Sequence, residues 1–305
     1  MSVSPTAIAF FHCGKIPRYL YAAMESARVF NPGSPIFLIT DRGSDVPSLG
    51  VKAVSLQDTA HHDLPQFRGI YRHIAFTAED YERRCFERWF HIEQLIKDRN
   101  LSRIAYLDSD CLIFADVDEL FRCMPEKTMC ASRDGGPACT LIRGTLQPFL
   151  DLILEKFSDD NYLLGKEQLR QQARGAGAMA NLTDMDLVAL FTTTHQGGHV
   201  YHNNLPTGHI DHCLNVPDAM EFLDIAHRNR RRKKIFWAQE KDRLLPYFRD
   251  AETGNRVPAL AIHFQSGAKR LIRRFNRVDG RCLLPLPLRL NFFRWLHAGW
   301  GSQYL

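Results

Sequence analysis

Two aspartates directly after an apolar segment are the strongest chemical feature of the sequence. Asp108 and Asp110 follow residues 103–107, which are predicted to form a buried strand, and a second apolar run, 111–114, comes after them. Two carboxylates at the end of a buried strand are unfavourable unless a positive charge compensates them. Mg²⁺ and Mn²⁺ prefer hard oxygen ligands and keep coordination positions open for phosphate oxygens. The pair therefore predicts a divalent-cation site, although an Asp-x-Asp tripeptide also recurs by chance and at helix caps.

A second group of polar residues follows a late apolar segment. Residues 256–264 are predicted to form a strand, with His263, Gly267 and Lys269 at its end or just beyond it. An imidazole can complete the coordination of a transition-type cation, which favours Mn²⁺ over Mg²⁺. Lys269 would offer a point charge to a diphosphate, and Gly267 would let the backbone approach it. The alternative for a lone histidine after a strand is a core or turn residue.

The elements that must position these groups begin with a strand–helix–strand pattern. Residues 7–11 and 36–40 are apolar runs typical of buried strands, and a helix is predicted from Pro17 to about Phe30 between them. This order indicates an α/β fold with a mainly parallel sheet covered by helices. Because ligands bind at the carboxyl ends of parallel strands, Asp108 and Asp110 lie where a site is expected.

The rest of the chain continues the pattern less regularly. Helices are predicted over 78–99, 148–157 and 186–191, and a strand over 139–142, whereas residues 192–217 are predicted to be irregular. No internal repeat, low-complexity tract or dividing linker is present. We therefore expect one domain over residues 1–270 and a basic, aromatic C-terminal extension over residues 271–305.

The two motifs together resemble those of GT-A glycosyltransferases, most closely glycosyltransferase family 8. Tyr106-Leu-Asp-Ser-Asp-Cys-Leu-Ile113 is similar to the family's YLDxD strand, and His263 and Lys269 keep the six-residue separation of its HxxGxxKPW motif. Gly267 falls one place late, and Arg270-Leu271 replaces Pro-Trp. Asp184-Met-Asp186 is similar to the family's DQD-like motif. The resemblance covers about residues 7–270.

The resemblance implies a metal-dependent transfer of a sugar from a nucleotide diphosphate, most simply a UDP-sugar. Asp110 would be the main carboxylate ligand of Mn²⁺ or Mg²⁺, with Asp108 near the ribose and the metal and His263 as the third ligand. Asp184 and Asp186 are the expected catalytic residues, facing the donor sugar or the acceptor hydroxyl. The expected donor-binding residues are Phe11, His12, Thr40, Asp41, Arg84, Arg88, Ser109, Gly267 and Lys269.

The motifs constrain the stereochemical outcome of the transfer and the identity of the acceptor less than they constrain the metal site. The resemblance implies retention, but inversion stays open if Asp184 or Asp186 acts as a general base. A glycan or lipid-linked acceptor is expected, as in polysaccharide or lipopolysaccharide biosynthesis, and Asn203 and Asn204 are candidates to hydrogen-bond its hydroxyls. They lie in a histidine-rich segment that we expect to be an ordered loop over the site rather than a zinc site. Its histidines are His195, His199, His202, His209 and His212.

The net charge of +5 is the sum of two unlike parts. Residues 228–305 contain 18 Lys and Arg against 5 Asp and Glu, whereas residues 1–227 contain 21 against 29. The basic run 228–234 would attract polyanions such as anionic lipid or a sugar diphosphate, unless it is a solvated surface. No nucleic-acid-binding motif accompanies it, so a nucleic-acid partner is not expected.

The composition and the arrangement of the cysteines bear on the cellular location of the protein. The eight cysteines are scattered and form no CxxC pair, which favours reduced thiols. The sequence has no uninterrupted apolar stretch of about 18 residues and no leader-like start. A cytoplasmic location is therefore expected. Residues 283–300 are predicted either to lie on an anionic membrane, which would make the protein peripheral, or to pack on the domain.

Two other hypotheses remain open at this point. A nucleotidyltransferase or phosphate-processing enzyme could use the same aspartate pair as its metal site, although no GxGTR-type loop follows the first strand. A non-catalytic protein could instead hold a polyanion or glycan on the basic surface of residues 228–281.

Overall fold

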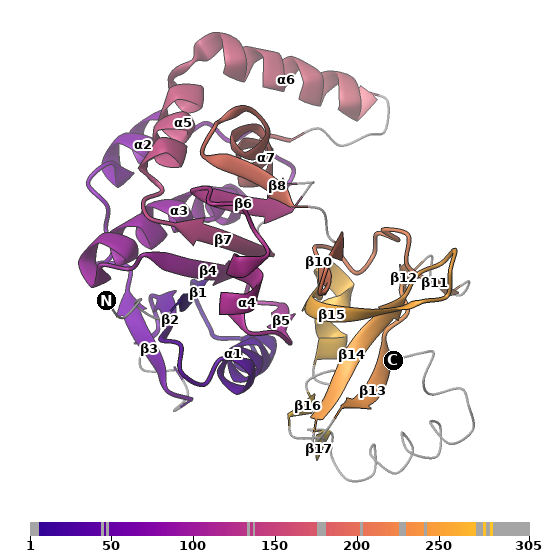
Figure 1. Ribbon diagram of the computed structural model, residues 1–305. Helices are drawn as coiled ribbons and strands as arrows, with labels where there is room; N and C mark the ends of the chain where they lie inside the picture. Colours follow the sequence, from indigo (N-terminus) through magenta and orange to yellow (C-terminus); the bar gives the residue numbers. More distant parts are fainter. Residues whose placement is uncertain are drawn as a thin grey trace.

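The computed structural model describes residues 6–43, 46, 49–132, 135, 136, 138–175, 181–201, 204–225, 230–240, 243–272, 277, 278, 281 and 282. Within these residues the chain forms a larger sheet flanked by helices, followed by a smaller sheet built mainly from the C-terminal third (Figure 1).

The larger sheet has the strand order β3-β2-β1-β4-β7-β6-β8. Neighbouring strands pair in parallel except for β7, which runs antiparallel to both β4 and β6. The prediction of an α/β fold with a mainly parallel sheet is therefore confirmed. The strands are β1 (Ala7–His12), β2 (Ile36–Thr40), β3 (Val51–Ser55), β4 (Arg103–Leu107), β6 (Met129–Ser132), β7 (Cys139–Arg143) and β8 (Gly198–Tyr201).

The helices of this part cover both faces of the larger sheet. They are α1 (Arg18–Phe30), α2 (Leu64–Ile70), α3 (Glu79–Arg99), α4 (Val117–Arg122), α5 (Gln147–Ser158), α6 (Asp160–Gly175) and α7 (Asp184–Thr194). Helix α3 carries Glu79, Asp80 and Glu82 in its first turn, and its C-cap residue, Asn100, adopts a left-handed conformation with φ of 48°. Acidic residues at the amino end and an asparagine at the carboxyl cap both favour these helix boundaries.

Alternate residues of the central strands enter two different hydrophobic cores. Ile8 and Phe10 of β1 pack in the core that contains α1, whereas Ala7 and Ala9 pack in the core that contains Trp89 of α3. Side chains of a strand point to opposite faces in turn, so a strand covered on both faces must be apolar at every position. This is why residues 7–10 and 36–39 are continuous apolar runs.

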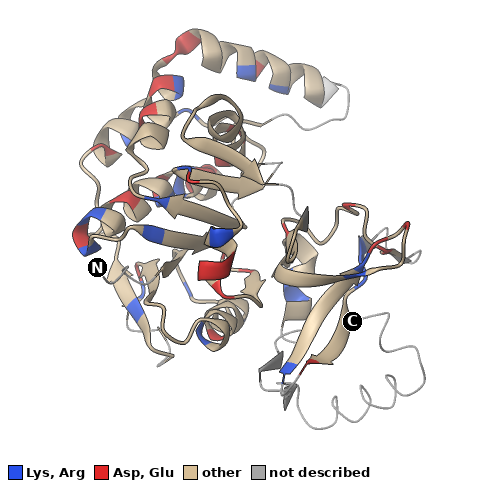
Figure 2. Ribbon diagram, in the orientation of Figure 1, with Lys and Arg blue, Asp and Glu red and all other residues tan. Residues whose placement is uncertain are grey.

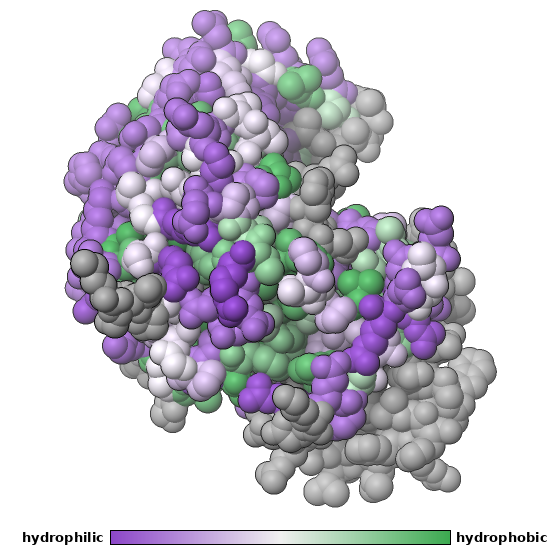
Figure 3. Space-filling view, viewed as in Figure 1, coloured by the Kyte–Doolittle hydropathy of each residue, from purple (hydrophilic) through white to green (hydrophobic). Residues whose placement is uncertain are grey.

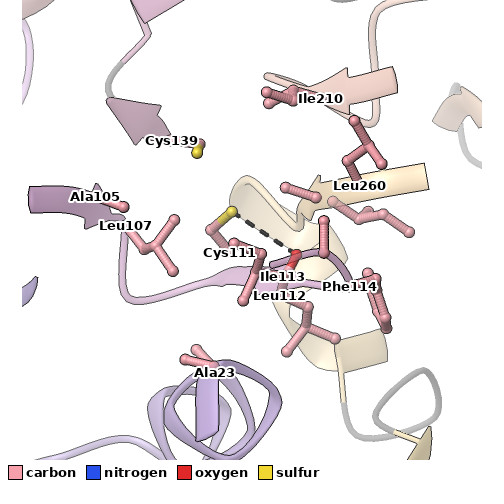
Figure 4. Close-up of a cluster of buried hydrophobic side chains, with 14 of the residues drawn as sticks. Ala23, Ala105, Leu107, Cys111, Leu112, Ile113, Phe114, Cys139, Ile210 and Leu260 are labelled. Carbon is pink, nitrogen blue, oxygen red and sulfur yellow. Dashed lines mark hydrogen bonds between the residues drawn. The ribbon is translucent and has the colours of Figure 1, made fainter. Parts of the chain in front are cut away.

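The smaller sheet joins the larger one through a short strand. Its strand order is β13-β14-β15-β10-β9, and β5 (Cys111–Ile113) pairs antiparallel with β15 (Arg256–His263). Side chains of β4, β5, β10 and β15 share one buried cluster with Ala23 of α1 (Figure 4). The remaining elements are β9 (Asn204–Leu205), β10 (Gly208–Asp211), β11 (Phe222–Ile225), β12 (Arg230–Lys233), β13 (Phe236–Glu240), β14 (Arg243–Arg249), the 3₁₀ helix η2 (Ser266–Leu271), β16 (Arg277–Val278) and β17 (Arg281–Cys282).

The prediction that residues 192–217 are irregular is wrong for part of this segment. Strand β8 pairs in parallel with β6, and β10 pairs in parallel with β15. Both are four-residue strands that contain glycine and histidine, and their stability comes from long-range pairing rather than from a local apolar pattern. The described histidines of this segment are thus divided among a helix end, two strands and the turn after β10.

The basic run is only partly a surface feature where it is described. Lys233 is buried with 1% exposure, and its ammonium lies 2.5 Å from both Asp211 and Asp218, while Lys234 pairs with Glu221 at 3.3 Å. Lys and Arg occur on both sheets (Figure 2). The expected C-terminal extension lies outside the described residues apart from 271, 272 and the short strands β16 and β17.

The surface of the molecule differs in hydropathy between the helices of the larger sheet and the region near the smaller sheet. The face shown in Figure 3 is mainly hydrophilic over the helices of the larger sheet, and hydrophobic residues gather around α4 and β5, near the smaller sheet. No described helix combines the length and the apolar character needed to cross a membrane.

The buried pair of Asp211 and Lys233 predicts a specific loss of stability in acid. Burial alone would raise the pKa of Asp211, but the charges and hydrogen bonds of Lys233 and His209 together outweigh it and lower the pKa to about 2. The carboxylate therefore contributes stability above its unfolded pKa of about 4, and this contribution is lost as the pH falls towards 2. We expect the wild-type protein to lose about 2 kcal/mol more unfolding free energy between pH 5 and pH 2 than Asp211→Asn does.

Urea unfolding at several pH values measures this difference. Asp58→Asn, which changes an exposed carboxylate, is the matched control and should follow the wild-type pH dependence. Parallel pH profiles for the wild-type protein and Asp211→Asn would show that the pair does not contribute in this way.

Candidate metal and donor site

The carboxyl end of β4 and the carboxyl end of β15 meet at one cluster. Ligand atoms of Asp108, Asp110 and His263 all lie within 4.8 Å of one another. The register brings them together, because Cys111 of β5 pairs with His263 of β15. Backbone hydrogen bonds fix the connecting turn: the Cys111 N–H donates to the Asp108 carbonyl at 2.9 Å, and the Phe264 N–H donates to the Asp110 carbonyl at 3.0 Å.

Positively and negatively ionisable groups lie close together in this cluster. His263 Nε2 lies 3.2 Å from Asp110 Oδ1 and 3.8 Å from Asp108 Oδ2, and Lys269 Nζ lies 3.1 Å from Asp110 Oδ2. Burial lowers the pKa of His263, but its hydrogen bond to Asp110 and the charges of the two aspartates outweigh this and raise the pKa to about 9. Burial raises the pKa of Asp110, and the contacts with His263 and Lys269 lower it overall.

The donor set of the cluster fits a divalent cation. Two carboxylates and one imidazole nitrogen converge, and the other ring nitrogen, Nδ1 of His263, donates to the His212 carbonyl at 2.6 Å. Metal-binding histidines typically use a backbone carbonyl in this way to fix their ring orientation. The mixed oxygen and nitrogen set suits Mn²⁺ better than Mg²⁺.

A buried arginine links this cluster to Asp184. Arg88 of α3 donates to Asp108 at 2.9 Å and to the Tyr106 hydroxyl at 3.0 Å, and its Nε donates to Asp184 Oδ2 at 3.1 Å. Trp89 Nε1 donates to the same oxygen of Asp184 at 3.0 Å. Burial raises the pKa of Asp184, and the charge of Arg88 acts against this increase. Asp184 is therefore held by donors from two neighbouring residues of α3 and is 3% exposed.

A cavity of about 720 Å³ opens over these groups. Ten of the residues predicted from the sequence line it, and they come from strand ends and the residues after them, from α3 and from the start of α7. They are Phe11, His12, Arg84, Arg88, Asp108, Ser109, Asp110, Asp184, His263 and Lys269. The structure thus places both sequence motifs and the first strand end around one space.

Other predicted residues lie elsewhere. Thr40 and Asp41 line a separate cavity of about 520 Å³, and Asp41 Oδ1 accepts from the Gly14 N–H at 2.7 Å. Asp186 does not line either cavity; its carboxylate accepts from the Thr183 N–H and hydroxyl at 2.9 Å, which caps α7. Gly267 lies in η2 and does not line the larger cavity.

The side chains of the two predicted acceptor residues lie outside the described part of the chain. Asn203 lies outside the described residues, and for Asn204 only the backbone in β9 is described, where it pairs with His209. Of the histidine segment, His212 lines the larger cavity, and the ring of His195 stacks on Phe191 at 4.4 Å.

Sequence reasoning missed several lining residues. Tyr19 of α1 lies with its ring 5.2 Å from the Lys269 ammonium, and Glu82 lines the cavity from the first turn of α3, the helix that carries Arg88. Burial raises the pKa of Glu82. The signal that could have identified Glu82 as a lining residue is its place in the predicted helix that also carries Arg88. Tyr81 of the same helix also lines the cavity, as does Gln265, which carried no such signal.

Comparison with known proteins gives limited similarity. No protein-family model matches the sequence, and no curated protein matches it. Among solved structures, the glycosyltransferase GlyE of Streptococcus pneumoniae TIGR4 is 15% identical with a TM-score of 0.35, over 65% of this chain and 45% of that chain. The galactosyltransferase LgtC in complex with donor and acceptor sugar analogues is 14% identical with a TM-score of 0.42, over 93% and 99% of the two chains.

A third similar structure is mouse xyloside xylosyltransferase 1, at 10% identity and a TM-score of 0.39, over 65% of this chain and 85% of that one. The match to this chain spans less than half the length of GlyE. All three similarities are low, with identities of 10–15% and TM-scores of 0.35–0.42.

Proposed function

We propose that the protein is a metal-dependent glycosyltransferase of GT-A architecture. It would move a sugar from a nucleotide diphosphate, most simply a UDP-sugar, to a glycan or lipid-linked acceptor. The observation that carries this proposal is the convergence of Asp108, Asp110 and His263, with Lys269 beside them, at the wall of the 720 Å³ cavity. The same cavity reaches Phe11 and His12 at the end of β1, where a nucleotide base would lie.

The residues around the cavity would have different roles in binding the donor. Asp108, Asp110 and His263 would hold Mn²⁺ or Mg²⁺, which supplies a Lewis-acid charge to the diphosphate. Lys269 would add a point charge to the same group and stabilise the leaving nucleoside diphosphate. Arg84 is exposed in the cavity, whereas Arg88 is buried and holds Asp108 and Asp184 in place. We therefore assign Arg84 to donor contact and Arg88 to positioning.

The surroundings of Asp184 and Asp186 support retention of configuration. A general base for an inverting transfer needs a carboxylate whose oxygens can reach the acceptor hydroxyl. Asp184 Oδ2 already accepts from Arg88 and Trp89, and Asp186 caps α7. The Asp186 carboxylate and the Oδ2 oxygen of Asp184 are thus engaged in fixed contacts. In this proposal Asp184 orients the donor sugar through its cavity-facing side, and Asp186 has a structural role.

Three further parts of the proposal rest on the sequence. They are contacts of Asn203 and Asn204 with the acceptor, membrane attachment through residues 283–300, and a cytoplasmic location.

Lys269→Gln is expected to weaken UDP binding about 10-fold while leaving uridine binding unchanged. The ammonium lies 3.1 Å from Asp110 and would contact the diphosphate, and hydrogen bonds to charged groups contribute about 1.5–3 kcal/mol. Isothermal titration with UDP and with uridine, both in Mn²⁺, measures the two affinities. Arg270→Gln changes the adjacent exposed residue and should leave both unchanged. An equal loss for UDP and uridine would exclude a diphosphate-specific role for Lys269.

The reaction class is tested by donor turnover. The protein is incubated with UDP-, GDP- and CMP-sugars in Mn²⁺, in Mg²⁺ and in EDTA, and free nucleotide is measured. We expect slow, metal-dependent hydrolysis of at least one nucleotide diphosphate sugar. Release of pyrophosphate from a nucleoside triphosphate and a sugar phosphate would instead indicate a nucleotidyltransferase, and no turnover with any donor would favour a binding protein.

A further inference from the structure

Lys233 is a buried lysine with all of its donors satisfied. It lies at the end of β12, and its ammonium contacts Asp211 Oδ1 at 2.5 Å, Asp218 Oδ2 at 2.5 Å and the Cys213 carbonyl at 3.0 Å. An ammonium has three donors, so these contacts use every one of them. The ammonium thereby ties the end of β10 to the segment that comes after it in the chain.

The segment fixed by Lys233 is the one that holds His263. Asp211 Oδ2, the other oxygen of the carboxylate that Lys233 contacts, accepts from the backbone N–H of His263 at 3.2 Å. The carbonyl of His212 accepts from His263 Nδ1 at 2.6 Å. His212 lies between Asp211 and Cys213, and both of these neighbours are contacted by the Lys233 ammonium.

These contacts determine where the second ring nitrogen of His263 points. With Nδ1 held by the His212 carbonyl, Nε2 lies 3.2 Å from Asp110 Oδ1. In the wild-type protein the 211–213 segment is thus a rigid support for the ring. Without Lys233, Asp211 would be a buried carboxylate without its closest positive charge, which is strongly unfavourable, so the segment would have to rearrange.

We propose that Lys233 is a positioning residue for the metal site: it holds the 211–213 segment so that His263 presents Nε2 to the cation. This inference rests on the proposed function, because it requires that Asp108, Asp110 and His263 bind a divalent cation. It also reassigns a residue of the basic run from a polyanion-binding surface to the interior. Partners of metal-bound histidines change metal affinity about 10- to 100-fold when they are removed.

The test uses Mn²⁺ itself as the probe. Electron paramagnetic resonance measures Mn²⁺ affinity, and electron spin-echo modulation detects the ¹⁴N nucleus of a coordinated imidazole. In the wild-type protein we expect tight binding with ¹⁴N modulation, and His263→Ala assigns that modulation to His263. We expect Lys233→Met to bind Mn²⁺ about 10-fold more weakly, with reduced ¹⁴N modulation.

Two further variants make the result decisive. Lys234→Met removes the neighbouring lysine, which pairs with Glu221 instead, and should behave as wild type. If Lys233→Met does not fold, the double variant Lys233→Met/Asp211→Asn removes the unbalanced buried charge and should fold, with the same loss of modulation. If folded Lys233→Met, or the folded double variant, binds Mn²⁺ with wild-type affinity and full ¹⁴N modulation, the role of Lys233 is overturned while the metal site still stands. No Mn²⁺ binding by the wild-type protein would overturn the metal site and the inference together.

Discussion

The Asp110→Asn variant is expected to bind Mn²⁺ more than about 100-fold more weakly than the wild-type protein, or not measurably. Asp110 is 4% exposed, and its two oxygens face His263 and Lys269 at 3.2 and 3.1 Å. An amide has one carbonyl oxygen and no charge, so it replaces neither the ligand strength nor the charge of the carboxylate. Loss of a direct ligand should exceed the 10- to 100-fold cost of losing an outer partner. Mn²⁺ titration followed by electron paramagnetic resonance measures this loss.

The matched control for this variant is Asp80→Asn. Asp80 also lines the cavity, but it is exposed and pairs with Arg83 on the surface of α3. We expect Asp80→Asn to bind Mn²⁺ as the wild-type protein does, and both variants to keep the wild-type circular dichroism spectrum. If Asp110→Asn is folded and retains wild-type Mn²⁺ affinity, Asp110 is not a metal ligand.

The second large effect is expected for stability, from Arg88→Met. Arg88 is buried between Asp108 and Asp184, and the change leaves Asp184 in the interior with Trp89 as its remaining described donor. Removing one partner of a buried ion pair typically costs about 3–5 kcal/mol, because the remaining charge is not compensated. Urea unfolding at pH 7 measures the free energy of unfolding. Arg84→Met, one helical turn earlier and exposed, should change it by less than about 1 kcal/mol.

A double-mutant cycle separates this charge effect from lost packing. Asp184→Asn removes the carboxylate, so in its presence the Arg88→Met change should be less costly by about 2 kcal/mol. Equal costs of Arg88→Met in the two backgrounds would show that pairing with Asp184 does not contribute to the stabilising effect of the arginine.

The central strands could be predicted from the sequence because burial on both faces leaves a local signature. Residues 36–39 and 104–107 are continuous apolar runs, and the strands predicted over 36–40 and 103–107 have the same bounds as β2 and β4. The short strands could not be predicted in this way. β5 and β10 have three and four residues, and both depend on pairing with β15, which is distant in sequence.

The cluster of Asp108, Asp110 and His263 could be anticipated because each motif comes at the end of a recognisable strand. The distinction between Arg84 and Arg88 could not, since both lie on one face of the same predicted helix. Only the packing of α3 against Tyr106 and Asp184 shows that Arg88 is buried. The burial of Lys233 could not be predicted either, because a basic run predicts exposure and its partners Asp218 and Asp211 lie 15 and 22 residues away.

The most direct test of the central claim is the metal dependence of nucleotide binding by the wild-type protein. Isothermal titration with UDP is carried out in Mn²⁺ and again in EDTA, with GDP and CMP in parallel. The geometry of Asp108, Asp110, His263 and Lys269 predicts binding of a nucleoside diphosphate in Mn²⁺ and a large loss of affinity in EDTA. Equal affinity in the two conditions, or no binding of any of the three nucleotides, would contradict a metal-dependent donor site.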